Sequence, residues 1–219
     1  MKKAYINNLF WLGFFAIWMA YLESSIVVYL RALYYPDGFA FPIKFIPNNI
    51  AIIEIGREAA TVFMMLAISF LLSKRGWVRT AYFMFCFGAW DIWYYIWLKI
   101  FLNWPPSLFT WDLLFLIPIA WSGPVWAPVL VSISLIFGAV VILKIDHMGI
   151  HFHLLRNEWL AFLTAPLLIF ISFVLEAPRI MKFAEPKFFH WEILILAEIV
   201  GFLMLAHVVK RLKKQSDKI

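Results

Sequence analysis

The chain has 219 residues, of which 64% are hydrophobic and 20% aromatic, with a formal net charge of +6 and a mean hydropathy of +0.85. A water-soluble fold of this length has too little core to bury so much apolar side chain. The composition therefore excludes a soluble globular domain and indicates a lipid bilayer as the solvent. The basic residues lie at the ends of apolar segments, which argues against nucleic-acid binding.

Six apolar stretches are long enough to cross the hydrocarbon core, which takes about 20 helical residues. Hydropathy places them at residues 9–31, 50–72, 78–101, 112–143, 158–177 and 191–209. The first stretch is too long for a signal peptide and lacks a small-residue cleavage pattern, so we expect it to remain as an anchor. The predicted fold is all-α, a bundle of six transmembrane helices that forms one polytopic domain over residues 1–219 without a soluble domain.

Lysine and arginine predict the orientation, because cytoplasmic loops are enriched in positive charge. With the N-terminus inside, twelve basic residues fall on the inner face: Lys2, Lys3, Lys74, Arg75, Arg79, Lys144, Arg156, Lys210, Arg211, Lys213, Lys214 and Lys218. Six fall on the outer face: Arg31, Lys44, Lys99, Arg179, Lys182 and Lys187. This excess predicts an inner (plasma) membrane protein with both termini in the cytoplasm. Anionic lipid headgroups are the expected partner of the basic C-terminal tail.

The fourth stretch is too long for one straight crossing and contains the sequence IPIAWSGPVWAP. Pro118, Gly123, Pro124 and Pro128 predict a kinked or broken helix, whose freed backbone groups must face protein or water. Trp121 would then form the wall of an apolar pocket beside the break. An ordinary proline kink with interfacial tryptophans is the alternative interpretation.

Five carboxylates fall in the outer half of the predicted bilayer: Glu23, Glu54, Glu58, Asp91 and Asp112. Glu54, Arg57 and Glu58 share one helical face, because Arg57 and Glu58 lie three and four residues after Glu54. Asp112 has a second interpretation, as an acid at the start of a helix that Thr110 caps. Glu198, in the middle of the last span, is a lesser candidate for the same network.

Three cations lie in the same half of the predicted bilayer: Arg31, Arg57 and Lys99. Arg57 is suited to hold two carboxylates, with Glu23 or Asp91 from a neighbouring helix as partner. An unpaired ion at the centre of a bilayer costs at least about 2.5 to 3.5 kcal/mol. Five acids against three cations leave two negative charges, so we expect two bound protons or a bound cation.

These two solutions have different chemical consequences. A protonated carboxyl is suited to act as a general acid or as a proton carrier. A divalent metal on oxygen ligands has little support, since no histidine accompanies the acids, and we assign no metal ligand and no cofactor. Ion pairs that only hold the helices in register are the structural alternative.

Two further patterns have weaker signals. The segments ESSIVVYLR and DIWYYIWLK both run from an acid to a base with seven residues between, which fits either a tandem repeat of a two-helix hairpin or coincidence. The histidines of DHMGIHFH are interpreted as part of a solvated loop rather than a metal site. Cys86 is the only cysteine, which excludes an intrachain disulfide and indicates a small core residue.

Three hypotheses from different classes follow. The first is a membrane enzyme that performs acid–base chemistry on a lipid or isoprenoid-like substrate; the second is a proton- or cation-coupled carrier; the third is a non-catalytic subunit that pairs with other membrane subunits in a larger complex. The candidate catalytic residues are Glu54, Glu58, Glu23 and Asp91. The candidate residues for binding or orienting a substrate are Arg57, Arg31, Tyr95, Lys99, Asp112 and Trp121.

Overall fold

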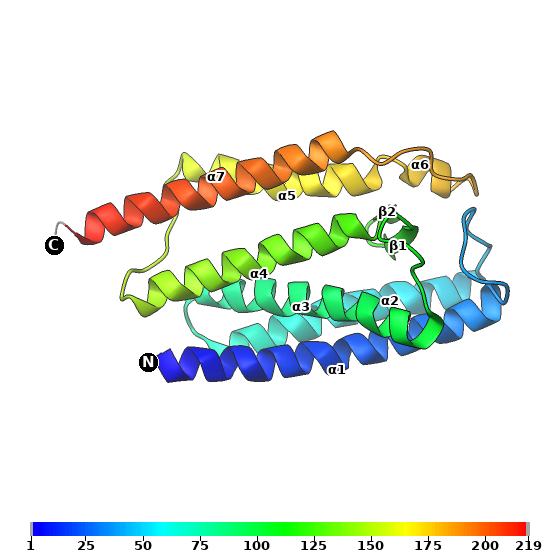
Figure 1. Cartoon of the computed structure of the whole chain (residues 1–219), viewed down its shortest axis with the longest axis horizontal. Helices are drawn as coiled ribbons and strands as arrows, with labels where there is room; N and C mark the ends of the chain where they lie inside the picture. Colours follow the sequence, from blue (N-terminus) through cyan, green and yellow to red (C-terminus); the bar gives the residue numbers. More distant parts are fainter. Residues whose placement is uncertain (1, 218–219) are drawn as a thin grey trace.

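The computed structural model describes residues 2–217, with side chains from Tyr5 onward. Long helices run along one axis and reverse direction at each connection (Figure 1). They are α1 (Lys2–Tyr34), α2 (Asn48–Leu72), α3 (Gly76–Leu102), α4 (Trp126–His147), α5 (Glu158–Val174) and α7 (Trp191–Ser216). A single helical turn, α6 (Ala177–Ile180), follows α5. The beginning of α1 and the end of α7 lie at the same end of the molecule, which we call the terminal end. We call the opposite end the hairpin end, after the β-hairpin that precedes α4.

Five helical segments within residues 2–217 are long and apolar enough to cross a membrane: Tyr5–Tyr34, Asn48–Leu72, Trp126–His147, Glu158–Ile180 and Trp191–Ser216. Helix α3 is as long, with 27 residues, but its tryptophans and tyrosines lower its hydropathy. It lies in the middle of the bundle against α1, α2 and α4, so less of it needs to face lipid. The chain is therefore a multi-pass helical membrane protein, whereas six crossings stay a prediction.

The main apolar core lies where α1, α3 and α4 meet. Small side chains line the contact, and Ala16, Ala81 and Ala139 are fully buried in it. Such residues let helix backbones approach closely, which increases van der Waals contact where lipid leaves no hydrophobic driving force between helices. Cys86 is buried in the same core as a free thiol, in the place that its sequence position predicts.

Helices α5 and α7 form a separate pair on the far side of α4 (Figure 1). The pair contacts the rest of the bundle through α7 against α4, α5 against strand β2 (Trp121–Pro124), and Trp159 of α5 against Trp77 of α3. The molecule thus has two helical layers joined along a narrow seam.

The predicted helix over residues 112–143 is wrong in its first part. Strand β1 (Trp111–Phe115) pairs antiparallel with β2 instead, with Asp112 opposite Gly123, and α4 begins only at Trp126. The prolines give the physical reason, because Pro118 and Pro124 have no N–H to donate to a helical turn and end the helix instead of bending it. Pro128 lies in the first turn of α4, where a missing N–H has little cost.

The long helices agree with the predicted all-α class, to which this hairpin adds one two-stranded sheet before α4. The hairpin also corrects the expectation for Asp112. Asp112 is not a helix-start acid, because it lies within β1 and is 1% exposed. The carbonyl of Thr110 accepts the N–H of Val125, so Thr110 closes the base of the hairpin and does not cap a helix. The predicted irregular segment therefore exists, with strand geometry in place of a broken helix.

Candidate functional site

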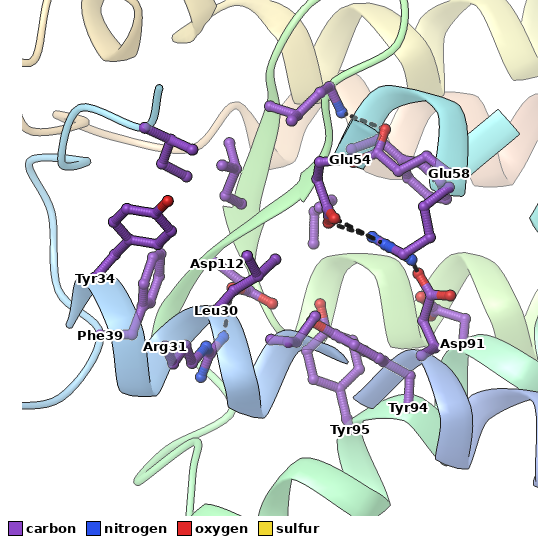
Figure 2. A pocket seen from close by; sticks show the side chains of 18 of the residues that line it. Leu30, Arg31, Tyr34, Phe39, Glu54, Glu58, Asp91, Tyr94, Tyr95 and Asp112 are labelled. Carbon is purple, nitrogen blue, oxygen red and sulfur yellow. Dashed lines mark hydrogen bonds and ion pairs between the residues drawn. The ribbon is translucent and has the colours of Figure 1, made fainter. Parts of the chain in front are cut away.

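A cavity of about 120 Å³ lies at the hairpin end of the bundle, and we call it the acid cavity. Its walls come from the last turns of α1, the first turns of α2, the second half of α3 and strand β1 (Figure 2). All five carboxylates that the sequence places in one half of the bilayer line it: Glu23, Glu54, Glu58, Asp91 and Asp112. Four segments that are distant in sequence therefore contribute acids to one small space.

Arg57 holds two of these acids. Its Nε donates to Oε2 of Glu54 at 2.9 Å, and its Nη2 pairs with the other oxygen of the same carboxylate, so the contact is bidentate. Its Nη1 forms an ion pair with Glu23 on α1. The Thr61 hydroxyl, one turn further along α2, donates to Glu23 Oε2 at 3.1 Å. One guanidinium thus ties α1 to α2 and leaves this group of three with a net negative charge.

Glu58 lies one turn after Glu54 and connects α2 to the hairpin. Its Oε2 accepts the backbone N–H of Leu116 at 2.8 Å, and the residue is 5% exposed. Strand β1 ends at Phe115, so the Leu116 N–H lies beyond the strand ladder and is available to a side chain. Within residues 2–217, Glu58 forms no ion pair at salt-bridge distance and its Oε1 takes part in no hydrogen bond.

Asp91 is the most isolated acid of the cavity. It is 8% exposed, and its hydrogen-bond partner is the Ser132 hydroxyl of α4, which donates to Oδ2 at 2.8 Å. Gly88, one turn earlier on α3, allows this contact, because a Cβ there would lie 2.6 Å from the Ser132 carbonyl oxygen. No lysine or arginine of the described chain lies within ion-pair distance of Asp91.

Arg31 and Asp112 form the second ion pair of the cavity, with 3.1 Å between Nη2 and Oδ1. The Arg31 guanidinium also lies over the rings of Trp104, at 3.8 Å, and Phe39, at 4.6 Å. Asp112 Oδ2 is buried without a hydrogen-bond partner. Because Asp112 lies in the hairpin, outside the spanning helices, its titration is easier to interpret: burial raises its pKa to about 6, although Arg31 opposes the shift.

The remaining predicted residues divide into two groups. Tyr95 lines the cavity beside Tyr94 (Figure 2). Lys99 does not line it, since its Nζ donates to the carbonyls of Asn103, at 3.2 Å, and Pro105, at 3.1 Å. Trp121 also lies elsewhere: its ring stacks on Phe173 of α5.

Sequence reasoning missed several cavity residues. Trp90, Tyr94 and Tyr34 line the space, and Ser132 contacts Asp91 from α4. The tyrosines and the tryptophan had a weak signal, because they lie within one to three residues of predicted acids or bases. Ser132 had none, since its position depends on how closely α4 packs on α3.

The charge balance of the cavity is more negative than the sequence predicts. With Lys99 bound to carbonyls outside the lining, two arginines face five acids, which leaves three negative charges if every acid is ionised. Within the described chain, no three histidines, cysteines, aspartates or glutamates are grouped in a geometry suited to a metal ion. Bound protons or a bound cation are the two ways to balance these acids.

Comparisons with protein-family models, with curated proteins and with solved structures find no match for this chain. The geometry of the site is therefore the basis for a functional assignment.

Proposed function

We propose that this chain is a membrane enzyme that performs acid–base chemistry on the reacting end of a lipid or isoprenoid-like substrate in the acid cavity. The observation that carries the proposal is the state of Asp91, a buried acid that lines a cavity, has one hydroxyl as partner and has no cation beside it. An acid in this environment favours its protonated form, which is the form that a general acid needs.

The contacts of the other residues suggest their roles. Asp91 donates a proton to the substrate, and Glu58, whose Oε1 is unoccupied by a hydrogen bond within residues 2–217, accepts one. One proton enters the substrate and one leaves it, so the net charge of the site is unchanged. Arg57 pairs with Glu23 and Glu54 and positions the first turns of α2, which carry Glu58.

The cavity volume limits what it accepts. A volume of about 120 Å³ holds about four water molecules, which is enough for a small head group or a terminal hydrocarbon unit. A whole lipid does not fit. The rest of the substrate would stay in the bilayer, which favours a substrate with one small reactive end.

The bundle core supports an enzyme over a carrier. Between the acid cavity and the terminal end, the helices are filled by apolar side chains such as Leu12, Met65 and Cys86, each at most 1% exposed. A carrier for protons or cations needs polar groups along its path through the membrane. A site that is closed on one side by apolar packing is better suited to chemistry on a membrane-bound substrate.

We also propose that the protein crosses the inner (plasma) membrane six times with both termini in the cytoplasm. The support is the excess of lysine and arginine on one set of loops, together with the shared end of α1 and α7. In this orientation the acid cavity lies in the outer half of the bilayer. Cysteine labelling tests this orientation. Single cysteines at positions 38 and 215, in a Cys86→Ala background, are labelled from either side of sealed vesicles.

The decisive experiment is hydrogen exchange into lipids. Purified protein is reconstituted into vesicles of phosphatidylethanolamine, phosphatidylglycerol and polyprenols in heavy water, and the lipids are analysed by mass spectrometry over time. An acid–base site adds deuterium at carbon or shifts a double bond in one lipid class. Asp91→Asn should lower the rate by about 10²- to 10⁴-fold, the usual contribution of a general acid.

Glu192→Gln is the matched control, because Glu192 is an exposed acid at the start of α7 that pairs with His190 away from the cavity. Its rate should equal that of the wild type. Absence of deuterium in every lipid class, or an unchanged rate in Asp91→Asn, would reject the enzymatic proposal.

A further inference from the structure

A second cavity, which we call the lateral groove, lies between the two helical layers. Its volume is about 360 Å³, and its walls come from α3, α4, α5 and α7. None of its lining residues belongs to the acid cavity. The lining is almost entirely apolar, with Phe83, Phe137 and Phe202 among its larger side chains.

Small residues leave the space between these walls open. Gly138, Ala165 and Gly201 line the groove on three different helices. A Cβ added at Gly201 would meet only the Ala165 Cβ, at 3.6 Å, so this position has room for a side chain. The groove runs along the helix axes from Ser134 and Glu198 to Trp77, near the start of α3.

Glu198 is the one acid of the groove, and its contacts are incomplete. Its Oε1 is buried and has no hydrogen-bond partner in the described chain. The residue lies seven positions after Trp191, at the start of α7, which corresponds to about 10 Å along the helix. At this depth in a membrane an acid with an unpartnered oxygen is costly, and such residues commonly mark ligand sites.

We propose that the lateral groove binds an apolar, elongated molecule that carries one hydrogen-bond donor, a hydroxyl or an ammonium group. The donor contacts Glu198 Oε1, and the apolar body lies along the groove toward Trp77. Complementarity carries the inference, since the groove offers one buried acceptor without a partner, Glu198 Oε1, in a lining that is apolar apart from this acid and the Thr80 and Ser134 hydroxyls. The proposal does not depend on the enzymatic function of the acid cavity.

Photolabelling tests this proposal. Protein in nanodiscs is exposed to three probes that share a C16 chain with a diazirine and differ in the head group: an alcohol, an amine and a methyl ether. We expect the alcohol or the amine to label peptides that contain Phe83, Phe137 or Phe202. The ether, which has no donor, should label them about tenfold less, since a hydrogen bond to a buried carboxyl contributes about that factor.

Three variants locate the label. Glu198→Leu removes the acceptor and should reduce labelling by the alcohol or amine to the level of the ether. Gly201→Leu fills the groove and should reduce labelling by all three probes. Leu203→Ala, at a lipid-facing position that is 61% exposed, is the matched control and should label as the wild type does.

Equal labelling of the wild type by the ether and the donor probes would overturn the proposal, because entry of any lipid tail would then account for the labelling of the groove. Unchanged labelling of Glu198→Leu would overturn it too. The comparison of probes on the wild-type protein needs no variant, so it decides the question even where Glu198→Leu fails to fold. If a co-purified protein or a second helix occupied the groove, none of the three probes would label it. This outcome would also reject the proposal.

Discussion

The acids at the two ends of the bundle differ in how completely they are paired. At the terminal end, Asp146 accepts from Arg75 Nη1 at 2.9 and 2.8 Å and from the Tyr5 hydroxyl, and His151 lies 3.6 Å away. In the acid cavity, Asp91 has one hydroxyl as partner. Both acids are less than 9% exposed, so burial alone does not distinguish them.

Glu158 repeats the pattern of the terminal end. It accepts from Arg211 at 2.8 and 2.9 Å and from the backbone N–H of Leu155 at 2.7 Å. Acids with a full set of donors stabilise the fold and have little capacity to exchange protons. Incomplete pairing, more than burial, therefore marks the acids that are available for chemistry.

Removal of the central arginine at each end should give the largest difference. Arg57→Gln leaves Glu23 and Glu54 buried without their cation, which should lower the free energy of unfolding by about 3 to 5 kcal/mol. Arg75→Gln should cost less than about 1 kcal/mol, because the Arg75 side chain is 58% exposed and Asp146 keeps Tyr5. Unfolding by denaturing detergent measures both. Equal losses at the two ends would contradict the distinction between them.

A change at Gly88 tests the contact that isolates Asp91. Gly88→Ala should cost about 1 to 3 kcal/mol, since the new Cβ would lie 2.6 Å from a backbone oxygen that has little freedom to move. Gly56→Ala in α2 is the matched control, because nothing lies within 4 Å of its added Cβ. This control should be neutral or stabilising by up to about 1 kcal/mol. A neutral Gly88→Ala would mean that α4 packs less closely on α3 than the structure shows.

Replacement of one acid at each end by its amide should change the stability less than removal of Arg57 does. The larger loss is now expected at the terminal end. Asp146→Asn weakens charge-assisted hydrogen bonds and should lower stability by about 1 to 2 kcal/mol. Asp91→Asn keeps an oxygen for Ser132 and replaces a carboxyl that has no cation partner, so its stability should stay within about 0.5 kcal/mol of the wild type. The same detergent titration compares the two variants. A larger loss in Asp91→Asn would show that Asp91 has a structural role.

Much of this arrangement could be predicted from the sequence because the signals are local. Hydropathy over about 20 residues identifies a span, and the predicted stretch 50–72 differs from α2 (Asn48–Leu72) only at its start. The gathering of the acids follows from alternating span directions and depth. Glu23, Glu54, Glu58 and Asp91 therefore reach the same end of the bundle as predicted.

The remaining features depend on tertiary contacts that have no local signal. The apolar run before α4 is compatible with a helix or a strand, and its strand form depends on pairing between β1 and β2. The bond from the Leu116 amide to Glu58 depends on where the pairing of β1 stops, at Phe115. Lys99 was predicted to balance an acid, but the carbonyls at the end of α3 are closer to its flexible side chain.

The smallest expected effect is a pH response at the Arg31–Asp112 pair. The pKa of Asp112 is raised to about 6, so the carboxyl is ionised and paired above this pH and becomes protonated as the pH falls through it. Arg31 lies 3.8 Å from the Trp104 ring, so the loss of its partner changes the charge next to an indole. The fluorescence difference between wild type and Trp104→Phe should therefore change with a midpoint near pH 6.

Asp112→Asn should remove this transition, whereas Asp146→Asn should preserve it, because Asp146 lies at the other end of the bundle. A transition that survives in Asp112→Asn would assign the titration to another acid of the cavity. It would also weaken the contrast between the incompletely paired acids of the hairpin end and the fully paired acids of the terminal end.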